Sequence, residues 1–108
     1  MGMTENLEKM LAGGRDDPML RFGLGSAYFN DGDLKQAIPH LESCIEQDEN
    51  YTAAYKLLGK ALFQLGEHVD AEAVLNRGLA RALSAGDKQT EKEVRVFLKK
   101  IEREKNGG

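Results

Sequence analysis

The segment Leu24-Gly25-Ser26-Ala27-Tyr28-Phe29 returns 34 residues later as Leu58-Gly59-Lys60-Ala61-Leu62-Phe63, and this repetition decides the fold. The remaining identities at the same shift join Gly32 with Gly66, Ala37 with Ala71, and Leu41 with Leu75. They fall on small or apolar positions and on a turn glycine. These are the positions at which successive copies of a structural repeat need similar residues, because they form the helix contacts and the turn. The sequence therefore predicts two successive units, Pro18–Tyr51 and Thr52–Ala85.

Each unit is predicted to contain two helices separated by a glycine turn. Asp17 and Pro18 are typical of a helix start, because the aspartate accepts bonds from free backbone N–H groups and proline needs none there. Gly32 supplies the left-handed residue that ends this helix, and Asp33 caps the next one. Apolar residues recur at helical spacing and no segment alternates like a strand, which predicts an all-α fold. Pro39 lies near the start of the second helix, where we expect a tolerated local distortion.

Two further helices are expected to flank the units. Thr4 is a predicted N-cap for a helix over residues 4–12, which Gly13 and Gly14 end. Residues 88–105 carry apolar side chains at positions 94, 97, 98 and 101, the spacing of an amphipathic helix. We expect this helix to cap the last unit, since terminal repeats need a polar outer face, and a helix that docks on a partner is the alternative. Residues 1–108 then form one domain, with units at 18–51 and 52–85.

The composition is typical of a soluble folded domain. Fifteen basic and eighteen acidic residues give a net charge of −3, which argues against a general nucleic-acid-binding protein. The charge is unevenly placed, with −6 in residues 1–51 and +3 in residues 52–108. No apolar run approaches the roughly 18 residues of a membrane span, and no signal peptide is visible at the N-terminus. We therefore expect a cytoplasmic protein that does not bind membranes.

The sequence contains no pattern that predicts catalysis or metal binding. A single cysteine, Cys44, excludes an intramolecular disulfide and is expected to be a buried, inert thiol. The pair Gly23-x-Gly25 lacks the third glycine of a dinucleotide-binding loop, because Tyr28 stands in its place. The two histidines have no companion ligands at metal-binding spacing. We expect no catalytic residue, no metal and no cofactor, and hence a protein that is not an enzyme.

The spacing of small and apolar residues over residues 17–85 resembles the tetratricopeptide repeat (TPR). The matching positions are Leu24, Gly25, Tyr28, Gly32, Ala37, Leu41 and Cys44, and then Tyr55, Leu58, Gly59, Leu62, Gly66, Ala71, Leu75 and Gly78. Arg21 replaces an aromatic residue of the pattern, and Glu49 and Leu83 replace the proline between repeats. The resemblance implies antiparallel helical hairpins stacked as a right-handed superhelix, whose concave face holds peptides or partner helices. Glycines inside helices, such as Gly25 and Gly59, then indicate that a neighbouring helix packs closely.

The same resemblance implies that the first helix of each unit lines the binding groove. The implied groove residues are Met19, Phe22, Ser26, Phe29 and Asn30 from the first unit, and Ala53, Lys56, Lys60, Phe63 and Gln64 from the second. The phenylalanines suit partner anchors, although packing on each other and under the N-terminal segment is the alternative. Lys56 and Lys60 lie four residues apart and suit a carboxylate-bearing ligand.

We therefore expect an interaction scaffold for a protein or peptide partner, present as a monomer or a weak homo-oligomer. The alternative function is a self-assembling structural module that acts through the exposed ends of the repeats, helped by the uneven charge.

Overall fold

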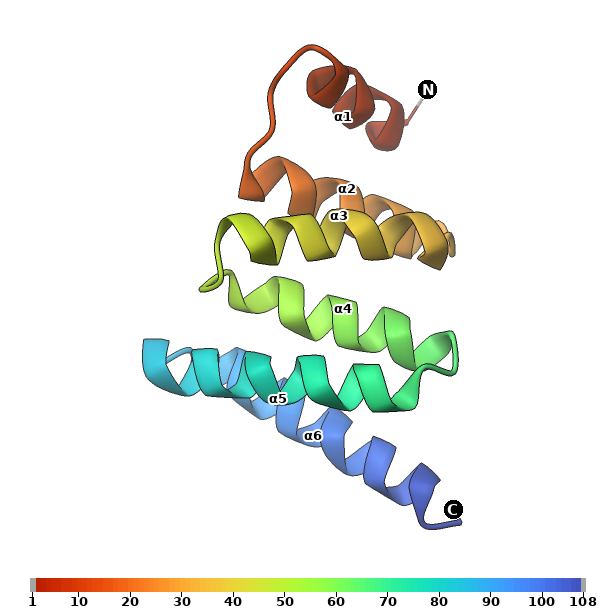
Figure 1. Ribbon diagram of the computed structural model, residues 1–108, viewed down its shortest axis with the longest axis vertical. Helices are drawn as coiled ribbons and strands as arrows, with labels where there is room; N and C mark the ends of the chain where they lie inside the picture. Colours follow the sequence, from red (N-terminus) through yellow and green to blue (C-terminus); the bar gives the residue numbers. More distant parts are fainter. Residues whose placement is uncertain (1, 108) are drawn as a thin grey trace.

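The computed structural model describes residues 2–107 as six α-helices without a strand, which confirms the predicted all-α class. The helices are α1 (Met3–Ala12), α2 (Pro18–Asn30), α3 (Leu34–Gln47), α4 (Thr52–Gln64), α5 (His68–Ala85) and α6 (Lys88–Lys105). Figure 1 shows them stacked along the long axis, with the two ends of the chain at opposite ends of the stack. The stack measures 46 × 29 × 18 Å.

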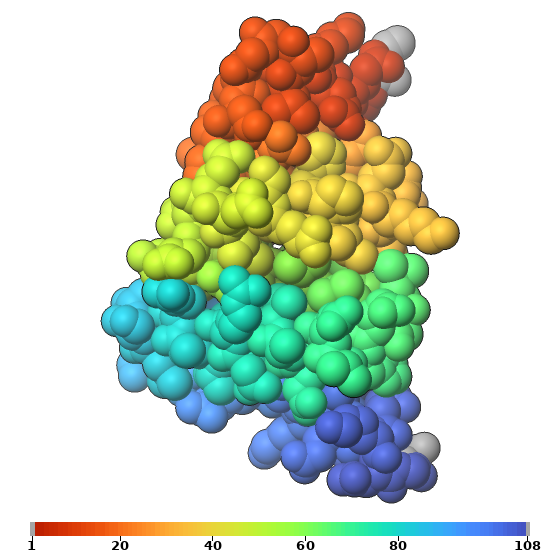
Figure 2. All heavy atoms as spheres, in the orientation of Figure 1, coloured from red at the N-terminus to blue at the C-terminus, as the bar shows by residue number. Residues whose placement is uncertain are grey.

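The helices pair as antiparallel hairpins in chain order. α2 packs on α3, and α4 packs on α5, while α4 also contacts α2, α3 and α6. α3 and α5 lie in front of α2 and α6 in Figure 1. The space-filling view in Figure 2 shows the colours following one another along the stack in the order of the sequence, with the two helices of a hairpin side by side. The packing is therefore mostly between neighbours in the sequence, as in other helical repeat proteins.

The predicted start and end of α2 and the predicted start of α3 are confirmed. The Asp17 carboxylate accepts a bond of 2.8 Å from the backbone N–H of Leu20, and Pro18 occupies the first turn of α2. Gly32 has a φ of +80°, in the left-handed region that favours glycine. The Asp33 carboxylate then accepts from the backbone N–H of Gln36 at 3.4 Å. These contacts satisfy backbone groups that a helix terminus leaves free.

The prediction that Thr4 caps the first helix is wrong. α1 begins at Met3 with the extended residue Gly2 as its N-cap, and Thr4 lies inside the first turn. The carbonyl of Gly2 accepts the first helical bond from the backbone N–H of Asn6, at 3.3 Å. Glycine is tolerated at an N-cap nearly as well as threonine, so the helix can start earlier than the hydroxyl suggests.

Pro39 lies inside α3, which continues from Leu34 to Gln47 without a break. Proline at this position removes one backbone donor, but the cap at Asp33 and the later turns of the helix keep their bonds. Because the proline is exposed, its ring does not displace a neighbouring helix.

The hairpins are held together by close contacts at glycines, as the sequence predicted. A Cβ atom added to Gly25 would lie 2.5 Å from the Leu41 side chain, and one added to Gly59 would lie 2.4 Å from that of Leu75. In the second hairpin, a Cβ at Gly78 would lie 2.5 Å from Tyr55 Cβ. The central core is formed by the buried residues Ala37, Leu41, Cys44, Ile45, Ala54, Tyr55, Leu58, Leu62, Ala71, Leu75, Val94 and Ile101.

Candidate partner-binding groove

The implied groove residues of α2 are partly exposed along one face of that helix. Met19 and Asn30 are exposed, and Phe22, Ser26 and Phe29 are half-buried. The Phe22 ring contacts the ring of Tyr51, with 5.1 Å between the centroids. The rings are therefore only partly available to a ligand, and Met19, 67% exposed, is the most accessible apolar group on α2.

In the second unit, α6 packs beside the implied groove residues of α4. Lys56 donates a hydrogen bond to Glu93 of α6, with 2.5 Å between Nζ and Oε1. The Phe63 ring meets Phe97 of α6 edge to face, with 5.2 Å between centroids. Lys60 places its Nζ 6.0 Å from the centre of the Phe97 ring. Ala53 is half-buried and Gln64 is exposed. The surface of the second unit is therefore shared between α4 and α6.

The three phenylalanines do not pack on each other. Among residues 2–107 their ring contacts join Phe22 to Tyr51 and join Phe63 to His68 and Phe97, and no ring pair connects two of Phe22, Phe29 and Phe63. The N-terminal helix contacts α2 at Gly23, through Leu7, and at Tyr28, through Glu8. All three phenylalanines pack against the central core and are partly buried there.

A hollow of about 490 Å³ lies between α4 and α6. Its lining residues are Lys60, Gln89, Lys92, Glu93, Val96 and Phe97. Of these, only Lys60 is among the groove residues implied by the repeat pattern. The hydrogen bond from Lys56 lowers the pKa of Glu93, so this carboxylate is ionised and already paired. Val96 and Phe97 form an apolar floor, bordered by Lys60 and Lys92, neither of which forms an ion pair among residues 2–107. This lining suits a ligand that offers both apolar and acidic groups.

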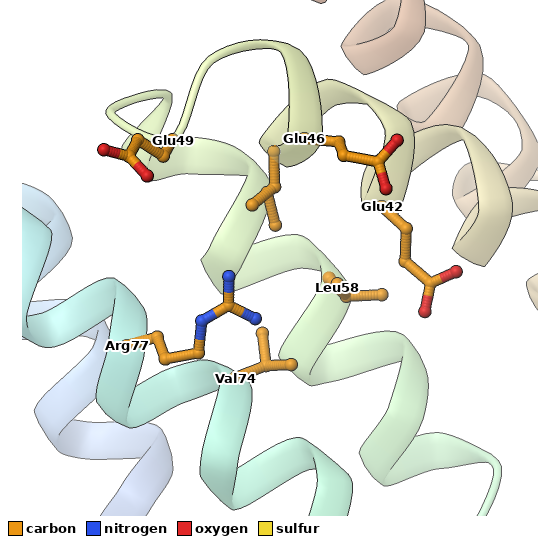
Figure 3. Close-up of a pocket in the computed structure, with 7 residues that line it drawn as sticks. Glu42, Glu46, Glu49, Leu58, Val74 and Arg77 are labelled. Atoms are coloured by element: carbon orange, nitrogen blue, oxygen red, sulfur yellow. The ribbon is translucent and has the colours of Figure 1, made fainter.

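A second hollow, also about 490 Å³, lies between α3 and α5 with α4 as its floor (Figure 3). Its lining residues are Glu42, Ile45, Glu46, Glu49, Leu58, Val74 and Arg77. Figure 3 shows the glutamates along the α3 side and Arg77 reaching in from α5. None of these residues was among the groove residues implied by the repeat. The spacing of four and three residues between the glutamates is the available sequence signal for an acidic edge.

The histidines take part in packing. His40 stacks on Tyr28, with 5.6 Å between ring centroids, and its Nδ1 lies 3.1 Å from Arg21 Nη1. Burial lowers the pKa of His40. His68 stacks on Phe63 at 4.7 Å. Within residues 2–107, no group of three or more histidine, cysteine, aspartate or glutamate side chains is placed to hold a metal ion. In the same part of the chain, every helix is too short or too polar to span a bilayer.

Comparison with known proteins identifies the repeat. A family model described as tetratricopeptide repeat matches residues 28–85. A TPR repeat-containing protein of Pseudomonas aeruginosa is 52% identical over 101 residues, which cover 94% of this chain and 96% of that protein. A solution structure from Bordetella parapertussis is 42% identical, with a TM-score of 0.85 over 96% of this chain and 90% of the other.

A protein of low sequence identity also has a similar fold. The type III secretion translocator chaperone SycD of Yersinia enterocolitica has a TM-score of 0.89 over 95% of this chain and 72% of its own. At 19% identity, this likeness shows the fold alone.

Proposed function

This chain belongs to the tetratricopeptide repeat family, and we propose that it binds a peptide or a helix of another protein in the groove along α2, α4 and α6. The tetratricopeptide repeat fold generally mediates protein–protein interactions, and its members are typically scaffolds and not enzymes. We infer that this chain, as a member of the family, is likewise a scaffold.

The observation that supports the groove most directly is the hollow between α4 and α6. Lys60, a residue implied by the repeat pattern, borders it beside the half-buried Phe97. Aromatic rings with partial exposure and nearby cations are frequent anchors at protein interfaces. The implied residues Met19, Phe22, Ser26, Phe29 and Asn30 on α2, and Lys56, Lys60, Phe63 and Gln64 on α4, form the proposed contact surface.

The proposal also includes the cellular compartment, the class of partner and the domain organisation of this scaffold. The only cysteine, Cys44, is a buried free thiol, which is consistent with a reducing cytoplasm. A net charge of −3 supports a protein partner over a nucleic acid. We propose that residues 1–108 act as one domain, because α6 packs against both helices of the second unit.

A pull-down from native lysate tests the groove. The double variant Phe29→Ala/Lys60→Glu is compared with the wild type and with Lys35→Glu, a charge reversal at an exposed position of α3. We expect the wild type and Lys35→Glu to capture the same partners and the double variant to lose them. Circular dichroism checks that all three fold. Identical partner lists for the wild type and the double variant would contradict the groove assignment.

Self-assembly is the second candidate function, supported by the charge distribution. The three glutamates that line the hollow between α3 and α5 belong to the half of charge −6, and α6 belongs to the half of charge +3. Opposite charges on different surfaces favour head-to-tail contacts between copies. Light scattering at low and high salt decides between the two functions. An oligomer at low salt that dissociates at high salt supports self-assembly, and a monomer in both conditions excludes it.

A further inference from the structure

Two adjoining hollows form a strip along one face of α6. The hollow between α4 and α6 shares Val96 with a neighbouring hollow of about 420 Å³, lined by Val96, Lys100, Arg103 and Glu104. The α6 residues that line the strip are Gln89, Lys92, Glu93, Val96, Phe97, Lys100, Arg103 and Glu104, which recur every three or four residues. A helix rises about 1.5 Å per residue, so the strip is about 20 Å long.

The strip is positively charged because four cationic side chains and two carboxylates line it. Lys60, Lys92, Lys100 and Arg103 line it, and no carboxylate within residues 2–107 forms an ion pair with any of them. Glu93 is already paired with Lys56, which leaves Glu104 as the only unpaired acid in the lining. Like charges that are gathered without partners repel each other, so an acidic ligand would relieve an unfavourable arrangement.

Aromatic rings hold two of these amines in place. Lys60 Nζ lies 6.0 Å from the centroid of the Phe97 ring, and Lys100 Nζ lies 5.6 Å from that of Phe63 and 5.5 Å from that of Phe97. Contact with a ring face restricts a lysine side chain, so less freedom is lost when a carboxylate binds. The amines are thus arranged around the Phe63–Phe97 pair.

The centre of the strip is apolar. Val96 is 60% exposed and lies where the two hollows meet, next to Phe97. An exposed valine between lysines favours a ligand that places an apolar side chain there and acidic groups on either side. Nucleic acid fits less well, because its phosphates repeat at every nucleotide and some would face Glu93 and Glu104, whereas a peptide can place neutral residues at those two points.

We propose that this strip binds an acidic peptide segment whose carboxylates meet Lys60, Lys92, Lys100 and Arg103 while one apolar side chain rests on Val96 and Phe97. The inference rests on the proposed function and names the chemistry of its partner. Lys92, Lys100 and Arg103 are spread along α6 and Lys60 lies on α4, so carboxylates at several places along a chain can meet them, whereas a single terminal carboxylate would reach only some of them.

Fluorescence anisotropy of the full chain tests this proposal with labelled 12-residue peptides that have amidated C-termini. One peptide carries glutamates around a central leucine, a second replaces the glutamates by glutamines, and a third replaces them by lysines. We expect the acidic peptide to bind at least about tenfold more tightly than the other two, and more weakly at high salt. A 12-nucleotide single-stranded RNA serves as the competing polyanion.

Variants of α6 locate the binding surface. Lys92→Glu/Lys100→Glu should lower the affinity for the acidic peptide by at least about tenfold, because two attractive charge interactions become repulsive. Lys88→Glu/Lys99→Glu makes the same charge change on exposed residues of α6 outside both hollows, and should retain more of the affinity. Equal losses in the two variants, or equal affinity for the acidic and glutamine peptides, would overturn the proposal. Tighter binding of the RNA than of the acidic peptide would overturn it as well.

Failure of this inference is distinguishable from failure of the proposed function. In one outcome, Phe29→Ala/Lys60→Glu loses the pull-down partners, Lys92→Glu/Lys100→Glu retains them, and the acidic peptide does not bind. This result would support the proposed groove and exclude the acidic-peptide site on α6. In the opposite outcome, the acidic peptide binds α6 as expected, but the wild type and Phe29→Ala/Lys60→Glu capture identical partners. This result would support the acidic-peptide site and exclude the wider groove.

Discussion

At the scale of single residues, three glycines set the distance between packed helices. Gly25 and Gly59 face Leu41 and Leu75, and Gly78 faces Tyr55, at separations that leave no space for a Cβ atom. Each glycine inside a helix costs about 0.5–1 kcal/mol relative to alanine. The leucine and tyrosine side chains that fill the space gain contacts in return, because packed interiors contain few voids.

The substitution Gly59→Ala is expected to lower the free energy of unfolding by about 1–3 kcal/mol, because the added methyl group would overlap Leu75. Gly23→Ala is the matched control, since its Cβ would lie an ordinary 3.5 Å from Leu7 Cδ1. It should be neutral or stabilising by up to about 1 kcal/mol, as alanine is the better helix former. Urea unfolding curves measure both, and similar losses in the two variants would contradict the overlap.

Cys44 gives a pH-dependent prediction. Burial raises the pKa of its thiol from 9.0 to about 11, so the folded state favours the protonated thiol. The stability that this group contributes is complete below pH 9 and decreases as the pH rises from 9 to 11. The melting temperature of the wild type should therefore fall more between pH 8 and 10 than that of Cys44→Ala. Parallel decreases in the two proteins would show that the thiol does not contribute.

The residues that could be predicted are those fixed by the repeat itself. Gly25 and Gly59 were identifiable because a helix tolerates an interior glycine mainly where a neighbour is close, and Cys44 because it occupies a small-residue position. Thr4 was assigned wrongly because several residues near a helix start are suitable caps, and local sequence does not rank them.

At the scale of helices, α1 and α6 differ in how firmly they are packed. None of the described residues of α1 is buried, and its polar contacts are the hydrogen bond from Tyr28 to Glu8 and the approach of His40 to Glu8 at 3.9 Å. In α6, Thr90, Val94 and Ile101 are buried. α6 therefore belongs to the core of the stack, and α1 covers its edge.

Hydrogen exchange should show this difference. Amides of α1 are expected to exchange fastest among the helices, because separating α1 from α2 exposes little apolar surface. Amides of α4, which contains six buried residues, should exchange slowest. Mass spectrometry of peptic fragments gives both rates in one sample. Protection of α1 equal to that of α4 would mean that α1 unfolds only with the whole domain.

The position of α6 shows where prediction from the sequence ends. Its amphipathic spacing predicts a helix that covers the last unit. The segment lacks a counterpart to the Leu-Gly pair of the repeats, although Phe97 lies one repeat length of 34 residues after Phe63. The Lys56–Glu93 pair and the Phe63–Phe97 contact join residues 37 and 34 positions apart, and several other lysines and glutamates on the same helices would have matched equally well. The strip around Val96 therefore emerges only from the packing of α6 on α4.

At the scale of the whole molecule, α6 contributes both to the core and to the proposed binding surface, and one substitution can be made in each. Ile101→Ala removes a fully buried side chain and should lower the free energy of unfolding by about 2–4 kcal/mol. Val96→Ala changes an exposed side chain and should alter it by no more than about 0.5 kcal/mol. Chemical unfolding measures both variants. A large loss in Val96→Ala would show that this valine supports the fold and is unavailable as an anchor.

The elongated stack also determines how the molecule responds to force. Its two chain ends lie at opposite ends of the long axis, so tension applied between them acts across successive helix–helix contacts. No disulfide bridges these levels, since the only cysteine is free. These contacts lie in series and carry the same tension, so the weakest is expected to yield first, and that is the contact of α1, none of whose described residues is buried. Under load, the chain would therefore lengthen in steps that begin at its N-terminal end.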